Sequence, residues 1–551
     1  MKEKNNLSNS INNISSRRSL ITHGGAMLGA ALLATPFTSA AQAPQENQAT
    51  EGIRYDVKKF GATGDRKDKA TKPFRDAIEA CTSNGGGIVN VPAGEYTVGT
   101  VQLKDNVTLN LEGGATLFLS QDRDDFLRGG RAMIYAENAK NIGVTGSGTI
   151  DGLARYDFTE MQGVDPEITE AIEIARAAGM DMRRYYRSRE AMNTFLFVIN
   201  DSTNFLLTGV SIINAPLWTV RLNDCDRVFV RGVYIYSDLE KGVNADGIDI
   251  CSCKNVTISD SVITTADDAI VLKAIARNGK AANPVENVTV TNCVLTSSST
   301  GLMIGTETEA DIRHVVFNNC VIRNSNKGFG INVQDGATVS DVIFSNLTIE
   351  TSRRHWNWWG DSEMFKFVLK KRKESSRLGK IRNIIVDNIV AQVMGTSTVT
   401  GHSDKPLENI RISNVQLSMV PENAKDKRAS HALKIERVKG LKVRDLSIKW
   451  DDDQPEEKWG SALVVKNVSD FVIDSFSGRQ GLKNGNAPAI LMDDVSDGIL
   501  RESRAQENTN TFVHITGSGT KDIILRDNHV KKAKKDVTFG DKSLAKVVEK
   551  R

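Results

Sequence analysis

The amino-acid sequence predicts an all-β fold, a single right-handed parallel β-helix (a solenoid) with an N-terminal capping helix and two inserted loops. Three observations lead to this prediction. A short motif recurs along the chain, in which Asn or Asp precedes alternating apolar residues. Most copies follow one another at steps in the twenties to low thirties of residues, and no helical periodicity accompanies them. Short strands repeating at this spacing are typical of stacked β-coils.

The N-terminal segment is expected to be an export signal over residues 1–43. The paired arginines Arg17 and Arg18 precede a modest apolar stretch over 24–37, and an A-x-A pattern follows at 41–43. This order resembles a twin-arginine signal peptide, which predicts a bacterial protein that is exported to the periplasm or secreted. The apolar stretch falls short of the roughly 20 residues of a spanning helix, so we expect no membrane span.

The β-helix itself is expected over residues 44–551. Its first element is a short amphipathic helix from Lys72 to Cys81, which would cover the open end of the first coil. The coils then follow one another, and each is marked by a copy of the motif. The copies begin at Asn106, Asn141, Asn204, Arg227, Asn255, Asn287, His314, Asp341, Asn383, Asn409, Gly440, Asp470, Asp497 and Asp522.

Two steps between motif copies are longer than the others and indicate inserted loops. The first insertion is expected at about 153–193 and contains a polar, helical stretch. The second, at about 351–380, contains a tryptophan-rich segment at 355–359. Long insertions in a rigid solenoid are usually functional loops, so both are interpreted in that way.

Four of the six cysteines share register positions in neighbouring coils. Cys225 and Cys253 each lie two residues before a motif copy, and Cys293 and Cys320 each lie six residues after one. Equivalent residues of adjacent coils stack about 4.8 Å apart. These thiols are interpreted as core residues, and a disulfide within either pair stays open.

The composition excludes several classes of protein. The chain carries 71 Lys and Arg against 68 Asp and Glu, a net charge of +3, whereas a nucleic-acid binder concentrates a basic excess. Six cysteines in 551 residues cannot form a disulfide scaffold of the small secreted type. We therefore expect a folded domain with no nucleic-acid partner.

Chemistry is expected at one register position that recurs in successive coils. Aligning the strands places four residues in one column: Asp246, Asp268, Thr300 and Lys327. Asp267 lies beside this column. Three carboxylates so close together repel one another, so at least one pKa should be raised. A protonated carboxyl group beside ionised ones is what general acid and general base catalysis needs.

A calcium site would use the same residue types and is the alternative interpretation of this cluster. It ranks second, because the three aspartates have no obvious fourth or fifth oxygen ligand beside them. No metal and no cofactor are therefore expected.

Several sequence blocks between about 53 and 420 share the pattern of one enzyme family. They are Phe60-Gly-Ala-Thr-Gly-Asp65, the segments 85–96 and 113–117, Pro216-Leu-Trp218, Asn244-Ala-Asp246-Gly-Ile-Asp and Asp267-Asp268-Ala-Ile-Val-Leu-Lys273. In these blocks the chain resembles glycoside hydrolase family 28, the polygalacturonase-type enzymes built on a right-handed β-helix.

The resemblance implies inverting hydrolysis of a glycosidic bond. By this likeness Asp267 would protonate the leaving oxygen, while Asp246 and Asp268 would activate the attacking water. Lys273 matches a family residue that follows the aspartate pair and would contact the carboxylates. Inverting enzymes keep acid and base about 6.5–9.5 Å apart to leave room for the water.

Two family blocks are missing from this chain. The Gly-His-Gly block falls at Ser299-Thr300-Gly301, and the Arg-Ile-Lys block falls at Gly330-Ile331-Asn332. In polygalacturonases the basic pair is thought to hold the carboxylate of galacturonate. Because a buried carboxylate without a cation is costly, the sugar at the cleaved bond is expected to be neutral, such as rhamnose. This favours a rhamnogalacturonan-type chain.

Further residues are expected to contact the substrate. Trp218 and Arg221 lie on the coil before Asp246, although a solvated strand position is the alternative for Arg221. Flat aromatic rings suit sugar faces, so Trp358 and Trp359 are interpreted as a stacking platform, with local packing as the alternative. The remaining expected contacts are Asn244, Lys273, Thr300, Glu307 and His355.

The sequence thus predicts an exported hydrolase that cleaves a pectin-like, rhamnogalacturonan-type or other plant or algal polysaccharide. One alternative is a lyase or epimerase on the same fold, although the aspartates lack an Arg or Lys base beside them, apart from Lys273 and Lys327, whose positions the sequence does not fix. The other is a non-catalytic carbohydrate-binding β-helix, since the fold alone does not give the function. The partner is a polysaccharide or oligosaccharide in each case.

Overall fold

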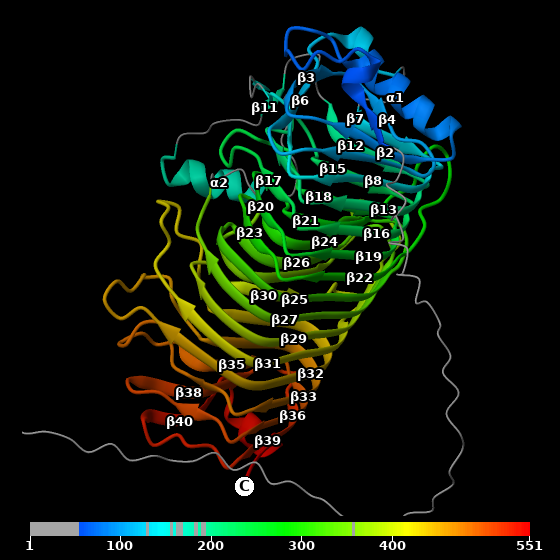
Figure 1. The fold of residues 1–551 in the computed structure, drawn as a ribbon. Helices are drawn as coiled ribbons and strands as arrows, with labels where there is room; N and C mark the ends of the chain where they lie inside the picture. Colours follow the sequence, from blue (N-terminus) through cyan, green and yellow to red (C-terminus); the bar gives the residue numbers. More distant parts are fainter. Residues whose placement is uncertain are drawn as a thin grey trace, which may run out of the picture. The chain divides into compact units, whose positions relative to one another are not determined.

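The computed structural model describes residues 54–127, 132–154, 158–160, 169–180, 186–188, 194–354 and 359–551. The expected export signal over 1–43 lies outside these residues. From residue 54 onward the chain winds into successive parallel coils, whose colours run in order along the stack (Figure 1). This confirms the predicted single right-handed parallel β-helix. None of the described helices is long and apolar enough to cross a membrane.

Strands of successive coils pair in parallel along three series. The first series, which carries the candidate site, consists of β4 (Val101–Gln102), β7 (Ala132–Glu137), β12 (Phe195–Asn200), β15 (Val220–Asn223), β18 (Ile248–Cys251), β21 (Ile270–Ala274), β24 (Thr300–Thr308), β26 (Lys327–Val333), β28 (Glu363–Leu369), β30 (Ser397–Thr400), β32 (Leu433–Trp450), β33 (Leu463–Asp474), β35 (Pro488–Asp493), β38 (Thr509–Thr516) and β40 (Ala533–Phe539).

The second series begins at the N-terminal end and runs beside the first. It consists of β1 (Arg54–Asp56), β2 (Gly87–Val91), β5 (Val107–Leu111), β8 (Lys140–Gly146), β13 (Thr203–Thr208), β16 (Asp226–Arg231), β19 (Lys254–Ser259), β22 (Val285–Thr291), β25 (Ile312–Ser325), β27 (Thr338–Thr351), β29 (Lys380–Val393), β31 (Leu407–Met419), then β32 and β33 again, β36 (Ser496–Arg501), β39 (Lys521–Arg526) and β41 (Val548–Lys550).

The third series closes each coil with short strands. It consists of β3 (Gly94–Val98), β6 (Ala115–Leu119), β9 (Thr149–Asp151), β14 (Ser211–Ile213), β17 (Tyr234–Tyr236), β20 (Val262–Thr265), β23 (Val294–Ser297), β34 (Ser477–Gly478) and β37 (Arg504–Ala505). In the middle of the molecule this third face is formed by the C-terminal halves of the long strands β25, β27, β29, β31 and β32.

Every residue that begins a copy of the sequence motif adopts a left-handed backbone conformation. The φ angles of these fourteen positions, from Asn106 to Asp522, lie between 52° and 76°. Asn, Asp and Gly reach this region at the least cost, which explains why the motif begins with them. The motif therefore marks the bend at which the chain enters each strand of the second series.

The motif asparagines also bond to one another from coil to coil. The side-chain amide of Asn141 donates to Oδ1 of Asn106 at 2.8 Å, and that of Asn204 donates to Oδ1 of Asn141 at 2.9 Å. The same bond recurs further on, from Asn287 to Asn255 at 2.9 Å. These ladders satisfy side-chain polar groups and fix the register of neighbouring coils.

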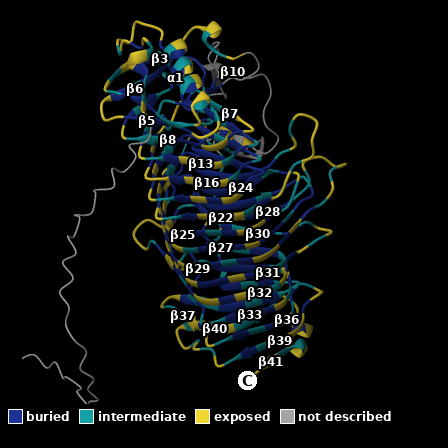
Figure 2. Ribbon diagram, turned by 45° about the vertical axis from the view of Figure 1, so that its right-hand side comes forward, coloured by how far each residue is buried: buried dark blue, intermediate teal, exposed yellow. Residues whose placement is uncertain are grey.

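Apolar side chains fill the inside of the coils as one continuous column, which Figure 2 shows as dark blue strand segments between yellow turns. The middle of the column contains a stack of phenylalanines. The ring centroids of Phe329 and Phe344 lie 4.4 Å apart, and those of Phe317 and Phe344 lie 4.9 Å apart. Such pairs add to the stability that comes from burial alone.

The capping helix is confirmed as α1 (Thr71–Ser83). Its apolar face buries Phe74, Ile78 and Cys81, and the helix contacts β1, β2, β4 and β5 at the N-terminal end of the coils. The described residues also form short 3-10 helices at Val57–Phe60, Arg123–Asp125 and Lys542–Val547.

The first predicted insertion leaves the coil after β9 and returns to it at β12. It contains the antiparallel pair β10 (Phe158–Glu160) and β11 (Tyr186–Ser188) and the helix α2 (Thr169–Ala177).

The prediction of a second insertion over 351–380 was wrong in its extent. Residues 363–369 form β28, a regular strand that pairs with β26 and β30. Its side chains alternate in the way that a coil requires, with Phe365 and Phe367 in the core and Lys366 exposed. The long step therefore contains an ordinary strand between the connecting segments 352–362 and 370–379, and residues 355–358 of the first segment lie outside the described residues.

All six cysteines are buried and free. The backbone N–H of Cys225 donates to Sγ of Cys253 at 3.3 Å, which confirms that equivalent positions stack in adjacent coils. The thiols occupy core positions, as the sequence predicted.

Candidate active site

The predicted column of polar residues exists on the first strand series. The pairing of β15, β18, β21, β24, β26 and β28 places equivalent residues of six coils in one row: Trp218, Asp246, Asp268, Thr300, Lys327 and Glu363. Backbone hydrogen bonds of 2.9 Å join the coils here, including those from Gly247 N to Asp268 O and from Ala269 N to Thr300 O. The row is thus built by the register of the β-helix itself.

The structure brings the three predicted aspartates together. One carboxylate oxygen from each of Asp246, Asp267 and Asp268 lies within 4.8 Å of the other two. Asp246 is 2% exposed and Asp267 is 8% exposed, while Asp268 is half-buried. All three lie in the turns that lead into β18 and β21, so loop ends on a rigid scaffold position them.

Hydroxyl and amide groups of the next coil hold the Asp267–Asp268 turn. The Oδ1 atom of Asp268 accepts hydrogen bonds from Ser299 Oγ at 2.8 Å and from Thr300 N at 3.1 Å. The backbone N–H of Asp268 donates to Oδ1 of Asp267 at 2.9 Å. The carbonyl oxygen of Asp267 accepts from Ser297 and from Thr265, at 2.7 Å and 2.8 Å.

Lys273 is the cation of the cluster. Its Nζ lies 3.6 Å from a carboxylate oxygen of Asp246, 3.2 Å from one of Asp249 and 3.8 Å from one of Glu307. The same ammonium lies 3.8 Å from the centroid of the Trp218 ring, in cation–π geometry. Lys273 thus contacts the carboxylates, as the family resemblance implies, and Glu307, which was expected to contact substrate, joins the same ion-pair network.

Asp249 is a member of the cluster that the sequence analysis missed. It lies between Ile248 and Ile250, both of which point into the core, so its side chain lies on the outer face of β18. It is fully buried there, and neither of its carboxylate oxygens has a hydrogen-bond partner among the described residues. A charged residue inside an otherwise apolar strand was the signal that could have found it.

Burial and mutual repulsion shift the protonation of the cluster. Burial raises the pKa of Asp246 well above its usual range, and Asp249 adds to this effect. Burial, Asp246 and Asp268 together raise the pKa of Asp267 in the same way. Burial also raises the pKa of Asp249 to about 7 against the pull of Lys273.

The pKa of Lys273 moves in the direction opposite to that which burial favours. Burial lowers it, but Asp249, Asp246 and Glu307 outweigh burial and hold the pKa of Lys273 well above its ordinary value. The lysine therefore stays charged while neighbouring carboxyl groups hold protons. The cluster thus combines a cation with carboxyl groups whose protonated form burial favours.

Two aromatic residues and an arginine lie on the two coils before that of Asp246: Trp218 and Arg221 on the adjacent coil, and Phe195 one coil further away. The guanidinium of Arg221 lies 4.9 Å from the Trp218 ring centroid and 5.3 Å from that of Phe195, and the two rings meet edge to face. Nε of Arg221 also donates to Asn223 at 3.0 Å. Trp218 is thus in contact with two cations, Arg221 and Lys273.

The other residues that were predicted to contact substrate differ in how far they are buried. Thr300 is 1% exposed, so it acts on the cluster through its backbone N–H, and its hydroxyl is enclosed. Asn244 is half-buried and adopts a left-handed conformation with φ 60°, two residues before Asp246. Trp359 is half-buried, whereas His355 and Trp358 lie outside the described residues.

The cluster is a poor calcium site. Three aspartates each offer one oxygen, whereas calcium takes six to eight oxygen ligands. The ammonium of Lys273 also lies close to Asp246 and Asp249, where a second cation would be repelled. The donor set suits proton transfer better than metal binding.

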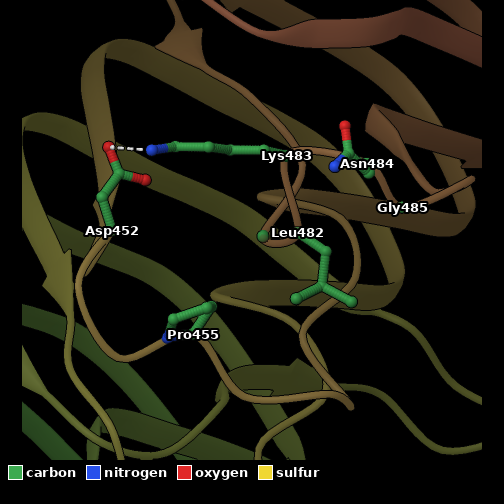
Figure 3. Close-up of a pocket in the computed structure, with 7 residues that line it drawn as sticks. Asp452, Pro455, Leu482, Lys483, Asn484 and Gly485 are labelled. Carbon is green, nitrogen blue, oxygen red and sulfur yellow. Dashed lines mark ion pairs between the residues drawn. The ribbon is translucent and has the colours of Figure 1, made fainter.

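A separate surface pocket of about 400 Å³ lies further along the chain, between residues 452 and 485 (Figure 3). Its lining includes Asp452, Pro455, Leu482 and Lys483. Asp452 already pairs with Lys483 at 3.4 Å and also with Arg479. Because its carboxylate is neutralised, this pocket lacks the acid and base that the aspartate cluster provides.

Comparison with known proteins identifies the family that the chain resembles. The profile of glycosyl hydrolases family 28 matches residues 81–435. A probable polygalacturonase from Vitis vinifera is 26% identical over 236 residues, which are 39% of this chain and 43% of the relative. An exo-poly-alpha-D-galacturonosidase from Dickeya chrysanthemi is 25% identical over 295 residues, 46% of this chain and 48% of the relative. The chain spans about half the length of these curated relatives.

Solved structures share the fold. An exopolygalacturonase from Thermotoga maritima superposes with a TM-score of 0.56 at 23% identity, covering 72% of this chain and 92% of that one. A family 28 exopolygalacturonase from Yersinia enterocolitica gives a TM-score of 0.57 at 20% identity, covering 76% and 78% of the two chains. At these identities the likeness establishes the architecture.

Proposed function

The chain belongs to glycosyl hydrolases family 28, and from this membership we propose that it hydrolyses glycosidic bonds of pectin-type polysaccharides. The observation that carries the proposal is the group of three aspartates whose oxygens lie within 4.8 Å of one another beside Lys273. Crowded, buried carboxyl groups with raised pKa values are suited to transfer protons near neutral pH.

In the proposed mechanism Asp267 is the general acid. Burial and the neighbouring Asp246 and Asp268 favour its protonated form, so it retains a proton to give to the departing glycosidic oxygen. Proton donation matters because the oxygen would otherwise leave with a full negative charge. The hydrogen bond from Asp268 N to Oδ1 of Asp267 leaves the other oxygen of this carboxyl group available to carry the proton.

Asp246 and Asp268 are proposed to hold the attacking water together. A water that donates one hydrogen bond of about 2.8 Å to each of two oxygens, at the roughly 105° angle between its O–H bonds, bridges a gap of about 4.5 Å. The oxygens of Asp246 and Asp268 lie within 4.8 Å, so a single water can reach both. The hydrogen bonds that Ser299 and Thr300 donate to Asp268 would fix one side of this bridge.

We further propose that hydrolysis inverts the anomeric configuration, as the family resemblance implies. The observed spacing is shorter than the about 6.5–9.5 Å between carboxyl groups that is common in inverting glycosidases. The stereochemistry therefore needs a direct measurement, in which proton NMR follows the first anomer released from an oligosaccharide. A product that retains the configuration of the substrate would contradict this step of the mechanism.

The sugar at the cleaved bond is proposed to be neutral, as in a rhamnogalacturonan-type chain. Gly330 and Asn332 stand where the family carries a basic pair, and neither supplies a cation. The coil next to Asp268 presents Thr300 and Met303, both uncharged. A carboxylate held against these residues would lose its hydration without gaining a partner.

A panel of pectic and algal polysaccharides, with product masses as the readout, tests the proposal. Hydrolysis adds one water to the products, and we expect it on chains with a neutral sugar at the cleaved bond and only weakly on homogalacturonan. Efficient release of galacturonic acid from homogalacturonan would contradict the neutral sugar. An unsaturated product that absorbs in the ultraviolet would mean a lyase, and no product on any chain would favour a binding protein.

We also propose that residues 1–43 direct export of the protein to the periplasm or beyond. The paired arginines Arg17 and Arg18, followed by an apolar stretch, support this proposal. Replacing both arginines with lysine should leave the protein in the cytoplasmic fraction of a bacterial host. Unchanged export of that variant would contradict a twin-arginine signal.

A further inference from the structure

We propose that Lys327 binds the carboxylate of an acidic sugar next to the cleaved bond. This inference rests on the proposed hydrolysis of a pectin-type chain and adds a specificity residue to it. Lys327 belongs to the same row as Asp246 and Asp268, but it stands on a coil where no role has been assigned to any side chain. Its charge, its burial and the lack of an ion-pair partner among the described residues point to a ligand from solution.

Lys327 is part of a regular strand, and its side chain is unusually buried for a lysine. It is 6% exposed and begins β26, where it pairs with Thr300 on one side and Glu363 on the other. Lysine is almost never this buried unless its charge has a partner. The burial of this lysine therefore needs an explanation, whereas a solvated lysine on the surface would need none.

The side chain of Lys327 runs over the outer face of the coil. Phe329 and Ile331 point into the core, so Gly330 between them faces outward. A Cβ atom built on Gly330 would lie 3.4 Å from Cδ of Lys327 and 3.0 Å from Sδ of Met303. The lysine stem thus lies on the surface where the absent family arginine would begin, and Met303 flanks the same space.

No residue that the structure describes forms a hydrogen bond or an ion pair with the ammonium of Lys327. Glu363 is the nearest acid in the row, but its Oε2 accepts from the backbone N–H of Asp361 and it makes no ion pair with Lys327. The ammonium is also not among the fully enclosed polar atoms that lack a partner. It therefore keeps access to solvent, and its counterion can come from a bound molecule.

The position of Lys327 sets which sugar it meets. It stands two coils from Asp268, which is about 10 Å between Cα atoms at a coil spacing of about 4.8 Å. The coil between them carries the uncharged Thr300 and Met303. The carboxylate is therefore expected on the sugar beside the one whose bond is cut. An alternation of neutral and acidic sugars fits this arrangement.

The inference is tested with a matched pair of substrates, rhamnogalacturonan oligosaccharides and the same chains after reduction of each carboxylate to an alcohol. Wild-type protein should prefer the acidic chain. Lys327→Met should lower kcat/KM on the acidic chain by about tenfold to a hundredfold, the range for a hydrogen bond to a charged group. It should have little effect on the reduced chain, and Lys327→Arg should keep most of the preference.

Lys366→Met is the matched control. Lys366 lies on the next coil, where its backbone pairs with that of Gly330 and its side chain is exposed. Replacing it with methionine removes one positive charge, as Lys327→Met does. Equal losses in both methionine variants would mean a diffuse charge effect and would overturn the inference. So would a Lys327→Met variant that keeps the preference of the wild type.

A binding measurement separates this inference from the proposed function. If wild-type protein cleaves no pectic chain, the proposed function fails, and calorimetry then tests Lys327 in the Asp267→Asn background. Weaker binding of the acidic oligosaccharide after Lys327→Met, with unchanged binding of the reduced one, would support the carboxylate site. Equal binding of both oligosaccharides by both proteins would overturn it. Equal melting temperatures for the variants establish that folding is intact.

Discussion

At the scale of single residues, Asp267 is a group whose surroundings favour the protonated form. It is 8% exposed, and both Asp246 and Asp268 raise its pKa in addition to burial. Asp267→Asn keeps the size of the side chain and the acceptor for Asp268 N but removes the proton donor. We expect kcat to fall by about 10²–10⁴-fold with an unchanged melting temperature.

The matched control for this prediction is Asp404→Asn, because Asp404 lies on an exposed turn far from the cluster in sequence. It should leave kcat as in the wild type. A pure Asp267→Asn protein with nearly full activity would mean that another group is the acid.

Asp249 gives a prediction about pH. The pKa of Asp249 is about 7 in the folded protein and about 3.9 in an unfolded chain, so the fold holds a proton that the unfolded chain releases. Its contribution to stability is therefore complete below about pH 4 and is lost as the pH rises through about 7. Asp249→Asn stays neutral throughout. The variant should match the wild type in unfolding free energy near pH 4 and exceed it above pH 7.

The same variant should also move the activity profile. Repulsion by Asp249 is the largest cause after burial of the raised pKa of Asp246. Without that charge Asp246 ionises at lower pH, so the acidic limb of kcat/KM should shift to lower pH. A variant that is less stable than the wild type at pH 8 would show that the ion pair with Lys273 outweighs the cost of burying the charge.

The sequence identified the aspartate trio because strand register can be aligned from a repeat. It could not identify the ion pairs of Lys273, since these depend on how long side chains cross the outer face of several coils. Asp249 was missed although it interrupts an apolar strand, because its alternation with Ile248 and Ile250 also fits an ordinary strand with one exposed face. The stacking of Arg221 on Trp218 and Phe195 likewise became visible only from packing.

At the scale of elements, the left-handed motif residues supply a testable source of stability. Asn287 has φ 58° and donates to Asn255 at 2.9 Å. Asn287→Ala loses this bond and leaves the left-handed conformation to a side chain that cannot hydrogen-bond locally as asparagine does, at a combined cost of about 1–3 kcal/mol. Asn287→Gly loses the bond but tolerates the backbone conformation.

Thermal unfolding should therefore rank the proteins in the order wild type, Asn287→Gly, Asn287→Ala. A glycine variant less stable than the alanine variant would show that backbone conformation is not the main role of this residue. The comparison matters beyond one site, because fourteen motif residues share the conformation.

Strands could be predicted where the motif recurs at a regular step, but not where the turns between strands vary in length. The motif located the strands of the second series from β5 to β39 but not β1, β2 or β41, and α1 was found within two residues at each end. The step from Asp341 to Asn383 was misread as one insertion, because length alone cannot separate two long turns from a loop. The alternating pattern of β28, in which Phe365 and Phe367 point inward, indicates a strand that the step length alone does not reveal.

At the scale of the whole molecule, a stacked β-helix depends on what covers its last coils. The strands β40 and β41 and the 3-10 helix at 542–547 pair with or contact β38 and β39 at the C-terminal end. Val537, Phe539 and Val548 pack against the core there. Deleting residues 531–551 would expose the last core row, which includes Val513, Ile515, Ile523 and Leu525.

Each of these four side chains contributes up to about 1.5–3 kcal/mol through burial, and the deletion also frees strand edges that can pair with other chains. We expect a lower melting temperature and association that increases with protein concentration, measured by light scattering.

The aspartate cluster lies near β18, ten strand pairings from β40, or about 48 Å at a spacing of about 4.8 Å. In a solenoid each coil contacts only its neighbours, so kcat well below the melting temperature should stay as in the full chain. A loss of kcat at temperatures where the truncated protein is still folded would contradict this independence of distant coils.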